Sequence, residues 1–338
     1  MALDDYLASE IALDCADGLL SRREAVRRLM LLGVTAPAAA ALLASCGSDD
    51  DDAEESPSTA GITSPTTTAS DTAPASSQVG TTPDQTASAP TGPTDDTAAG
   101  DPATTAEAPA SAVTEEIRFA GPRGELIGVL ATAADPRGAV LVIHENRGLT
   151  DHIRTIPPRL AADGYTSLAI DLLSEEGGTA ALATEGDATA ALGNASTERL
   201  IEDLRAGIDE LERRAPGAEL AAIGFCFGGG MTWQLLAAGE PRLSAAVPFY
   251  GPAPDGADFS GSPNAAVLGI YAELDARVNA SQETARGALE AAGLAHEILV
   301  LPGVDHAFFN DTGPRYGADA AAEAYQAMLD WFAQHLAE

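Results

Sequence analysis

The sequence contains no lysine, so all 18 basic residues are arginine, and 51 aspartate and glutamate residues bring the formal charge of the 338-residue chain to −33. Aromatic residues make up only 5% of the chain. A chain this acidic repels the phosphate backbone of nucleic acids, and no basic stripe offsets the repulsion. We therefore expect no nucleic-acid partner, and a catalytic or small-molecule role comes first.

Arginine is also absent from residues 47–113, which consist mainly of Ser, Thr, Ala, Pro, Gly and Asp. Such a composition cannot bury enough apolar surface to offset the entropy that ordering the chain would cost. The sequence therefore predicts a disordered tether over residues 46–113. A tether of this kind holds a folded domain at a distance from its anchor.

An export signal is predicted for residues 1–45. Paired arginines, Arg22 and Arg23, precede an apolar run from Leu29 to Ala44 that is shorter than the roughly 20 residues a spanning helix needs. The pair resembles a twin-arginine signal, and Leu-Ala-Ser-Cys at 43–46 resembles a bacterial lipobox, in which Cys46 becomes lipidated. We expect a protein that is anchored through lipid on the outer side of the bacterial cytoplasmic membrane. An uncleaved anchor helix is the alternative.

Cysteine is scarce: the chain has Cys15, Cys46 and Cys226. Because Cys15 precedes the expected cleavage site and Cys46 is the expected lipidation site, Cys226 has no partner for an internal disulfide. A lone thiol in an exported protein needs another explanation.

The folded part is predicted to span residues 114–338, a normal size for one large α/β domain. Short apolar runs alternate with helical patterns, and most runs are continuously apolar, as in parallel strands buried on both faces. This order predicts a doubly wound, mostly parallel sheet flanked by helices, with its ligand site at the carboxyl ends of the strands. The expected strands are 115–119, 126–131, 139–144, 165–171, 220–225, 245–250, 266–272 and 296–301, and the expected helices are 151–163, 200–213, 229–238, 280–292 and 318–337.

The segment Gly224-Phe225-Cys226-Phe227-Gly228 follows an expected strand and opens an expected helix. This is the context of a nucleophile elbow, in which the positions two before and two after the nucleophile must be small. Here the pattern G-x-S-x-G carries cysteine in place of serine. The alternative is a glycine-rich turn with an inert buried cysteine.

A thiol nucleophile needs a base, and the base needs a group that orients it. His306 lies in a loop after the last expected strand, and Asp275 ends the strand before it. The chain order nucleophile, acid, histidine is that of the α/β hydrolases. Asp305 and Glu273 are rival acids, but Asp305 is the immediate neighbour of His306 and is poorly placed to reach its ring.

A third group of residues, His144-Glu145-Asn146-Arg147-Gly148, ends another buried strand. A loop at this place supplies one N–H of an oxyanion hole, here assigned to Asn146, and the residue after the nucleophile, Phe227, supplies the other. Glu145 then lies beside the thiol, where it could take the thiol proton or hold Cys226 in a resting state. A solvated loop carboxylate is the alternative.

Taken together, these motifs resemble the dienelactone hydrolase (carboxymethylenebutenolidase-like) family of α/β hydrolases over essentially all of residues 114–338. The resemblance implies a triad of Cys226, His306 and Asp275, with Glu145 interacting with the thiol. It also implies hydrolysis of small esters or lactones through a thioester, with no metal or cofactor.

The dienelactone enzymes hold the substrate carboxylate with arginines, one after the second central strand and one shortly after the catalytic histidine. Here the matching regions, residues 171–176 and 308–310, contain no arginine, and Arg147 and Arg315 are the nearest substitutes. We therefore do not expect an anionic dienelactone as substrate. The physiological ester and the oligomeric state stay open.

Two other functions fit the same residues. One is a non-catalytic lipoprotein that binds a ligand in the hydrolase cleft, against which the complete set of triad residues argues. The other is redox chemistry at Cys226, which lacks a resolving cysteine.

Overall fold

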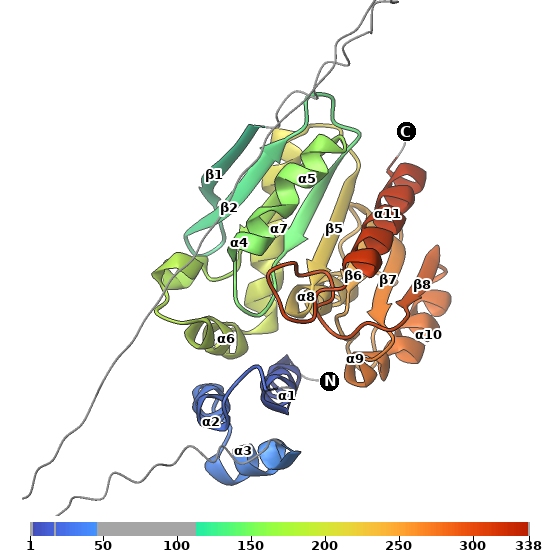
Figure 1. Cartoon of the computed structure of the whole chain (residues 1–338). Coiled ribbons are helices and arrows are strands. Elements are labelled where there is room, and N and C mark those ends of the chain that lie inside the picture. The colour runs from blue at the N-terminus through green and yellow to red at the C-terminus, as the bar shows by residue number, and fades with distance from the viewer. Residues whose placement is uncertain (1–2, 17, 46–112, 337–338) are drawn as a thin grey trace, which may run out of the picture. The chain divides into compact units, whose positions relative to one another are not determined.

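The computed structural model describes residues 3–16, 18–45 and 113–336. Its centre is a single sheet of eight strands in the order β1-β2-β4-β3-β5-β6-β7-β8 (Figure 1). The strands are β1 Val113–Ala120, β2 Glu125–Thr132, β3 Gly138–Ile143, β4 Tyr165–Asp171, β5 Leu220–Phe225, β6 Leu243–Phe249, β7 Ala266–Ala272 and β8 His296–Leu301.

Six strands, β3 to β8, run parallel to one another, whereas β2 is antiparallel to both of its neighbours, β1 and β4. Every residue of β3, β4, β5 and β7 is buried, which explains why these strands are continuously apolar in sequence. The predicted α/β-hydrolase architecture is confirmed, and each predicted strand boundary lies within two residues of the observed one.

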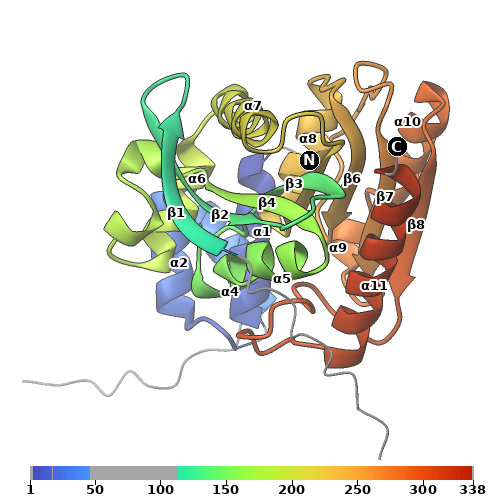
Figure 2. The ribbon, with the colours of Figure 1, turned by 90° about the horizontal axis from the view of Figure 1, so that it is seen from above.

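Helices cover both faces of the sheet: α5 and α11 lie on one face, and α7, α8 and α10 lie on the other (Figure 2). The helices after β3 are α4 Asp151–Arg154, α5 Ile156–Ala162, α6 Glu185–Asn194, α7 Thr197–Arg214, α8 Phe227–Ala237, α9 Ala276–Asn279, α10 Gln282–Ala292 and α11 Ala318–His335. Short 3-10 turns follow β4 at η2 Ser174–Glu176 and η3 Thr179–Ala181.

Three further helices form at the N-terminus: α1 Leu3–Ala16, α2 Arg22–Leu31 and α3 Ala36–Leu42, followed by the 3-10 turn η1 Leu43–Ser45. They belong to the same compact unit as the sheet and its helices. Sequence analysis sets residues 1–45 apart from the fold as an export signal, whereas the structure packs α1 and α2 against α6, beside the carboxyl ends of the central strands (Figure 1). In the described part of the chain, no helix has the length and apolarity that crossing a bilayer requires.

One predicted helix is interrupted, and another is found close to its predicted bounds. The helix expected at 151–163 breaks at Thr155 into α4 and α5, because Pro157 and Pro158 cannot donate backbone hydrogen bonds to the preceding turn. The helix expected at 280–292 is α10, preceded by the separate short helix α9 that Asp275 caps. The helix α6, which is rich in alanine and glycine, was not predicted.

Candidate active site

Cys226 lies in the turn between β5 and α8. Its backbone has φ 57° and ψ −116°, a conformation that residues with a side chain rarely adopt, and its N–H donates to the carbonyl of Phe249 at 3.1 Å. Such strain persists only where the surrounding structure enforces it, and it aims the thiol above the carboxyl edge of the sheet. The strained turn predicted from the sequence is therefore present.

Close packing of the backbone requires glycine two residues before and two residues after Cys226. A Cβ atom at Gly224 would lie 2.0 Å from the carbonyl oxygen of Gly228, and one at Gly228 would lie 2.3 Å from that of Ile143. Both neighbours are backbone atoms that cannot move aside. At this turn the backbones of β3, β5 and α8 approach so closely that no side chain fits between them.

His306 and Asp275 form a buried pair. His306 Nδ1 lies 2.6 Å from Asp275 Oδ2, and both side chains are 1% exposed. Asp275 is itself fixed, because it is the N-cap of α9 and its Oδ1 accepts from the Val278 N–H at 3.1 Å. The structure thus brings together the acid and the histidine that the sequence paired.

The two rival acids are engaged elsewhere. Asp305 Oδ1 accepts from the backbone N–H of His306 at 2.6 Å, and Glu273 Oε2 accepts from the Gly303 N–H at 2.8 Å. Neither contacts the imidazole ring. Both carboxylates shape the loop that carries His306.

The pKa of His306 is raised to about 9. Burial lowers it, but the negative charge on Cys226 and the hydrogen bond to Asp275 raise it by more. The imidazole is therefore a cation near neutral pH, and it lies beside the sulfur of Cys226. A thiolate is the nucleophilic form of cysteine.

His144 fixes the loop that follows β3. Burial is the main cause that lowers the pKa of its imidazole, so the ring is neutral. Its Nδ1 lies 2.7 Å from the Glu145 carbonyl, and its Nε2 accepts from the Leu172 N–H at 3.1 Å. This buried bridge holds residues 145–147 at the mouth of the site.

Glu145 is buried, as expected for a residue inside the site, but its contact differs from the one predicted. Its Oε2 accepts from Asn310 Nδ2 at 2.7 Å, and its Oε1 has no hydrogen-bond partner among the described residues. A carboxylate from another part of the chain, that of Glu10, lies 3.8 Å from the Cys226 sulfur. The interaction of Glu145 with the thiol stays a prediction.

One cavity of about 60 Å³ gathers the predicted pocket residues. Phe227 is the first residue of α8. Its N–H belongs to the first turn of the helix, where backbone N–H groups have no partner within the helix, and the Gly230 N–H donates to the Cys226 carbonyl. Cys46, the predicted lipidation site, lies outside the described residues. The predicted residues that line the cavity are Glu145, Asn146, Arg147, Cys226, His306 and Arg315.

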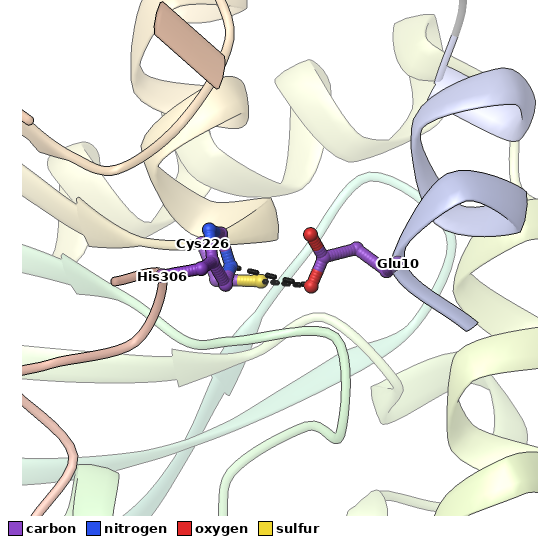
Figure 3. Close-up of side chains that lie close together, drawn as sticks. All are labelled: Glu10, Cys226 and His306. Carbon is purple, nitrogen blue, oxygen red and sulfur yellow. Dashed lines mark hydrogen bonds and ion pairs between the residues drawn. The ribbon is translucent and has the colours of Figure 1, made fainter. Parts of the chain in front are cut away.

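Residues from α1, which sequence analysis missed, reach into the same cavity (Figure 3). Glu10 Oε2 lies 3.8 Å from Cys226 Sγ and 3.2 Å from His306 Nε2, and Tyr6 Oη lies 3.2 Å from the same sulfur. Arg277, also missed, pairs with Glu10. The available signal was the spacing of Leu7, Ile11 and Cys15, which predicts one apolar helix face before the paired arginines.

Among the described residues, one group offers ligands for a metal ion: Glu10, Cys226 and His306, whose ligand atoms lie within 4.8 Å of one another. Thiolate, imidazole and carboxylate are ligands that Zn²⁺ accepts. Two members of the group also have partners outside it, because Glu10 pairs with Arg277 and His306 pairs with Asp275. The expected absence of a metal or cofactor stays a prediction.

A mostly parallel sheet with a strained nucleophile turn, a histidine after the last strand and an acid after the strand before it defines an α/β hydrolase. The sequence model of the dienelactone hydrolase family matches residues 126–336. The chain belongs to the dienelactone hydrolase family, and it is a hydrolase that acts on ester bonds.

Comparison with known proteins agrees. A protein of Escherichia coli O157:H7 assigned as a carboxymethylenebutenolidase is 36% identical over 212 residues, which cover 59% of this chain and 78% of that protein. The crystal structure of a protein assigned as a dienelactone hydrolase, from Klebsiella pneumoniae subsp. pneumoniae MGH 78578, has 31% identity and a TM-score of 0.59, covering 67% of this chain and 100% of that chain.

A second similar structure is that of P91, a dienelactone hydrolase-like promiscuous phosphotriesterase from metagenomic libraries. It is 26% identical with a TM-score of 0.57, and the match covers 67% of this chain and 99% of P91. In both comparisons, about two thirds of this chain matches nearly the whole length of the other protein.

Proposed function

We propose that the protein is an exported cysteine hydrolase of small esters or lactones that works through a thioester on Cys226, His306 and Asp275. The observation that carries the proposal is the placement of Cys226 in the strained turn, with its charge raising the pKa of a histidine that Asp275 holds at 2.6 Å. Nucleophile, base and orienting acid thus occupy the positions that acyl transfer requires.

In the proposed cycle the Cys226 thiolate attacks the carbonyl carbon of the ester, forming a C–S bond as the carbonyl electrons move to oxygen. The N–H of Phe227 and the N–H of Asn146 stabilise the oxyanion. As the oxyanion collapses, the bond to the leaving alcohol breaks, and His306 gives the alcohol its Nε2 proton. Neutral His306 then takes a proton from water, whose attack on the thioester releases the acid and restores the thiolate.

Arg147 and Arg315 line the cavity and are the proposed substrate-binding residues. In the full chain both pair with Asp14 of α1, at 3.8 Å for Arg147 and 3.2 Å for Arg315. Their guanidinium groups therefore face the pocket. We propose that they contact polar groups of the acyl or alcohol part of the substrate.

Export and lipid anchoring complete the proposal. The paired Arg22 and Arg23, the apolar run after them and the lipobox-like sequence that ends at Cys46 support them. A domain on the outer side of the bacterial cytoplasmic membrane would meet esters that arrive from outside the cell.

The test is to trap the thioester. Because Tyr6 and Glu10 of α1 cover Cys226 in the full chain, a specific protease site is placed between residues 46 and 112, and the purified chain is cut and diluted before the assay. The cut wild type and the cut Cys226→Ala variant are then incubated with activated short-chain esters and simple lactones, quenched in acid and examined by mass spectrometry. We expect an acyl group on Cys226, more of it in His306→Asn because that variant cannot activate water, and loss of turnover in Cys226→Ala. Hydrolysis at the same rate in Cys226→Ala, or turnover with no acyl group on Cys226, would contradict the thiol mechanism.

A further inference from the structure

One face of α1 lies over the catalytic pocket. Tyr6, Glu10 and Asp14 are spaced four residues apart and therefore share that face. Tyr6 Oη and Glu10 Oε2 approach Cys226 Sγ at 3.2 Å and 3.8 Å, and Asp14 contacts Arg315 at 3.2 Å. Three successive turns of this helix thus make polar contacts with residues of the pocket.

Arg277 holds this helix in place. Its Nη2 pairs with Glu10, and its guanidinium group lies 4.6 Å from the centre of the Tyr6 ring. The Arg277 side chain is only 16% exposed and that of Glu10 only 5%, so the pair is shielded from solvent. Separating one partner from a buried pair is strongly unfavourable, because it leaves the other charge uncompensated.

Glu10 blocks the two atoms on which the proposed cycle depends. Its Oε2 lies 3.2 Å from His306 Nε2, the nitrogen that must give its proton to the leaving alcohol (Figure 3). The same oxygen lies on the approach to Cys226 Sγ. Burial is the main cause that raises the pKa of Tyr6 well above its usual value, so the phenol stays protonated, with its oxygen 3.2 Å from the sulfur of Cys226.

The space left beneath α1 is too small for a substrate. The cavity that contains Cys226 and His306 measures about 60 Å³, whereas small-molecule sites usually measure about 300–1,000 Å³. Cys226 and His306 are 3% and 1% exposed. An ester can therefore reach the thiol only after α1 moves away.

The helices that follow support this position of α1. Ile11 and Cys15 pack with residues of α2, α3 and η1 in a separate apolar cluster, and Leu7 packs in the main core. The helix is thus anchored by apolar contacts next to its polar face. The cluster comprises Ala8, Ile11, Cys15, Ala25, Leu29, Ala39 and Leu43.

We propose that α1, residues Leu3–Ala16, is an intramolecular inhibitor that fills the catalytic pocket with Glu10, so that the full-length chain is a latent form of the hydrolase. Loss of residues 1–45, the predicted signal, opens the pocket and removes the carboxylates of Asp14 and Glu10 from Arg147, Arg315 and Arg277. That α1 inhibits hydrolysis rests on the proposed function, but the occlusion of Cys226 can be measured without any ester.

The experiment measures the rate at which a small alkylating reagent, iodoacetamide, labels Cys226 in the full chain at pH 7.5, both with and without a chelator. Glu10→Arg places a guanidinium group against Arg277 and His306, and we expect it to raise the labelling rate about tenfold or more. Asp5→Arg is the matched control, because it makes the same change at an exposed position of the same helix and should leave the rate within twofold. Peptide mapping confirms that the label is on Cys226.

A second arm leaves the pocket unaltered. A specific protease site is placed between residues 46 and 112 of the full chain, which is purified intact and then cut. Cutting makes the contact between α1 and the pocket bimolecular, so dilution should release the inhibitor and raise the labelling rate. The uncut chain should show no dependence on concentration.

The outcomes separate the two proposals. Equal labelling rates in the wild type, Glu10→Arg and the diluted cut chain would overturn the inhibitor proposal. A labelling rate that rises in the wild type when only the chelator is added would also overturn it, because a bound metal ion would then be what protects the thiol. Faster labelling of Glu10→Arg and the cut chain without ester turnover would support occlusion and count against the proposed hydrolase function. A parallel rise in labelling and turnover supports both.

Discussion

At the scale of single residues, the imidazole of His306 interacts with three other ionisable side chains, those of Asp275, Glu10 and Cys226. Its Nδ1 lies 2.6 Å from Asp275 and its Nε2 lies 3.2 Å from Glu10, while the charge on Cys226 helps to raise its pKa to about 9. The sequence predicts the pairing of Cys226, His306 and Asp275, because their chain order matches the strand ends that carry them. It cannot show Glu10 at the thiol, since that contact joins residues 216 positions apart through tertiary packing.

The raised pKa of His306 predicts the alkaline limit of activity. The imidazolium is the acid that protonates the leaving alcohol, so it is present below about pH 9 and is lost as the pH rises through that value. We expect kcat/KM of a form with an open pocket to fall above about pH 9. In Asp275→Asn one cause of the raised pKa is gone, so the fall should begin at lower pH and kcat should drop by about 10²- to 10⁴-fold.

Asp305→Asn is the matched control for that measurement, because Asp305 accepts from a backbone N–H and not from the ring. Its alkaline limit should coincide with that of the unaltered enzyme. The assignment of Asp275 would be wrong if the two variants exchanged these profiles.

At the scale of elements, the strands are the best predicted part, because burial on both faces forces continuous apolar runs that the sequence displays. Helix boundaries are less well predicted. Pro157 and Pro158 divide one predicted helix, and α6 was missed because it is small-residue rich and lacks a strong apolar stripe. The N-terminal α1 was missed because its polar side faces a charged pocket, so its pattern does not resemble that of a surface helix.

Two glycine-to-alanine substitutions, one in the turn between β5 and α8 and one in α10, should have opposite effects on stability. Gly228→Ala sets a methyl group 2.3 Å from the carbonyl oxygen of Ile143, so β3 and α8 must separate, and we expect a loss of about 3 kcal/mol or more in the free energy of unfolding. Gly287→Ala, within α10 and with nothing near its Cβ, should instead stabilise the protein by up to about 1 kcal/mol. Denaturant unfolding measures both, and equal effects would contradict the close packing of the turn.

At the scale of the whole molecule, residues 1–45 have two descriptions. In sequence they resemble an export signal, and in the structure their helices are part of one compact unit with the catalytic sheet. The descriptions are compatible if the signal is docked before export and lost after it. Sequence patterns alone cannot show that residues 1–45 pack against the catalytic domain, because an export signal and a helix that packs against a core use the same apolar residue types.

Export itself can be tested on the whole chain in a bacterial host. We expect the protein in the membrane fraction, open to protease added to spheroplasts, and we expect Arg22→Lys with Arg23→Lys to retain it in the cytoplasm, because lysine does not replace the planar, multiply donating guanidinium of a paired-arginine signal. Cys46→Ser should be exported but not labelled by a radioactive fatty acid. Unchanged distribution of both variants would count against export through this signal.

The position of α1 also bears on the order of events during synthesis. Glu10 is made 296 residues before His306 (306 minus 10), an interval of roughly 15 to 60 s at the usual speed of translation. The covering helix therefore already exists when the last strand and the histidine loop emerge. Helix α1 can therefore cover the Cys226 thiol as soon as the pocket folds. A newly made molecule then passes through no stage in which the folded active site is accessible to metabolites inside the cell.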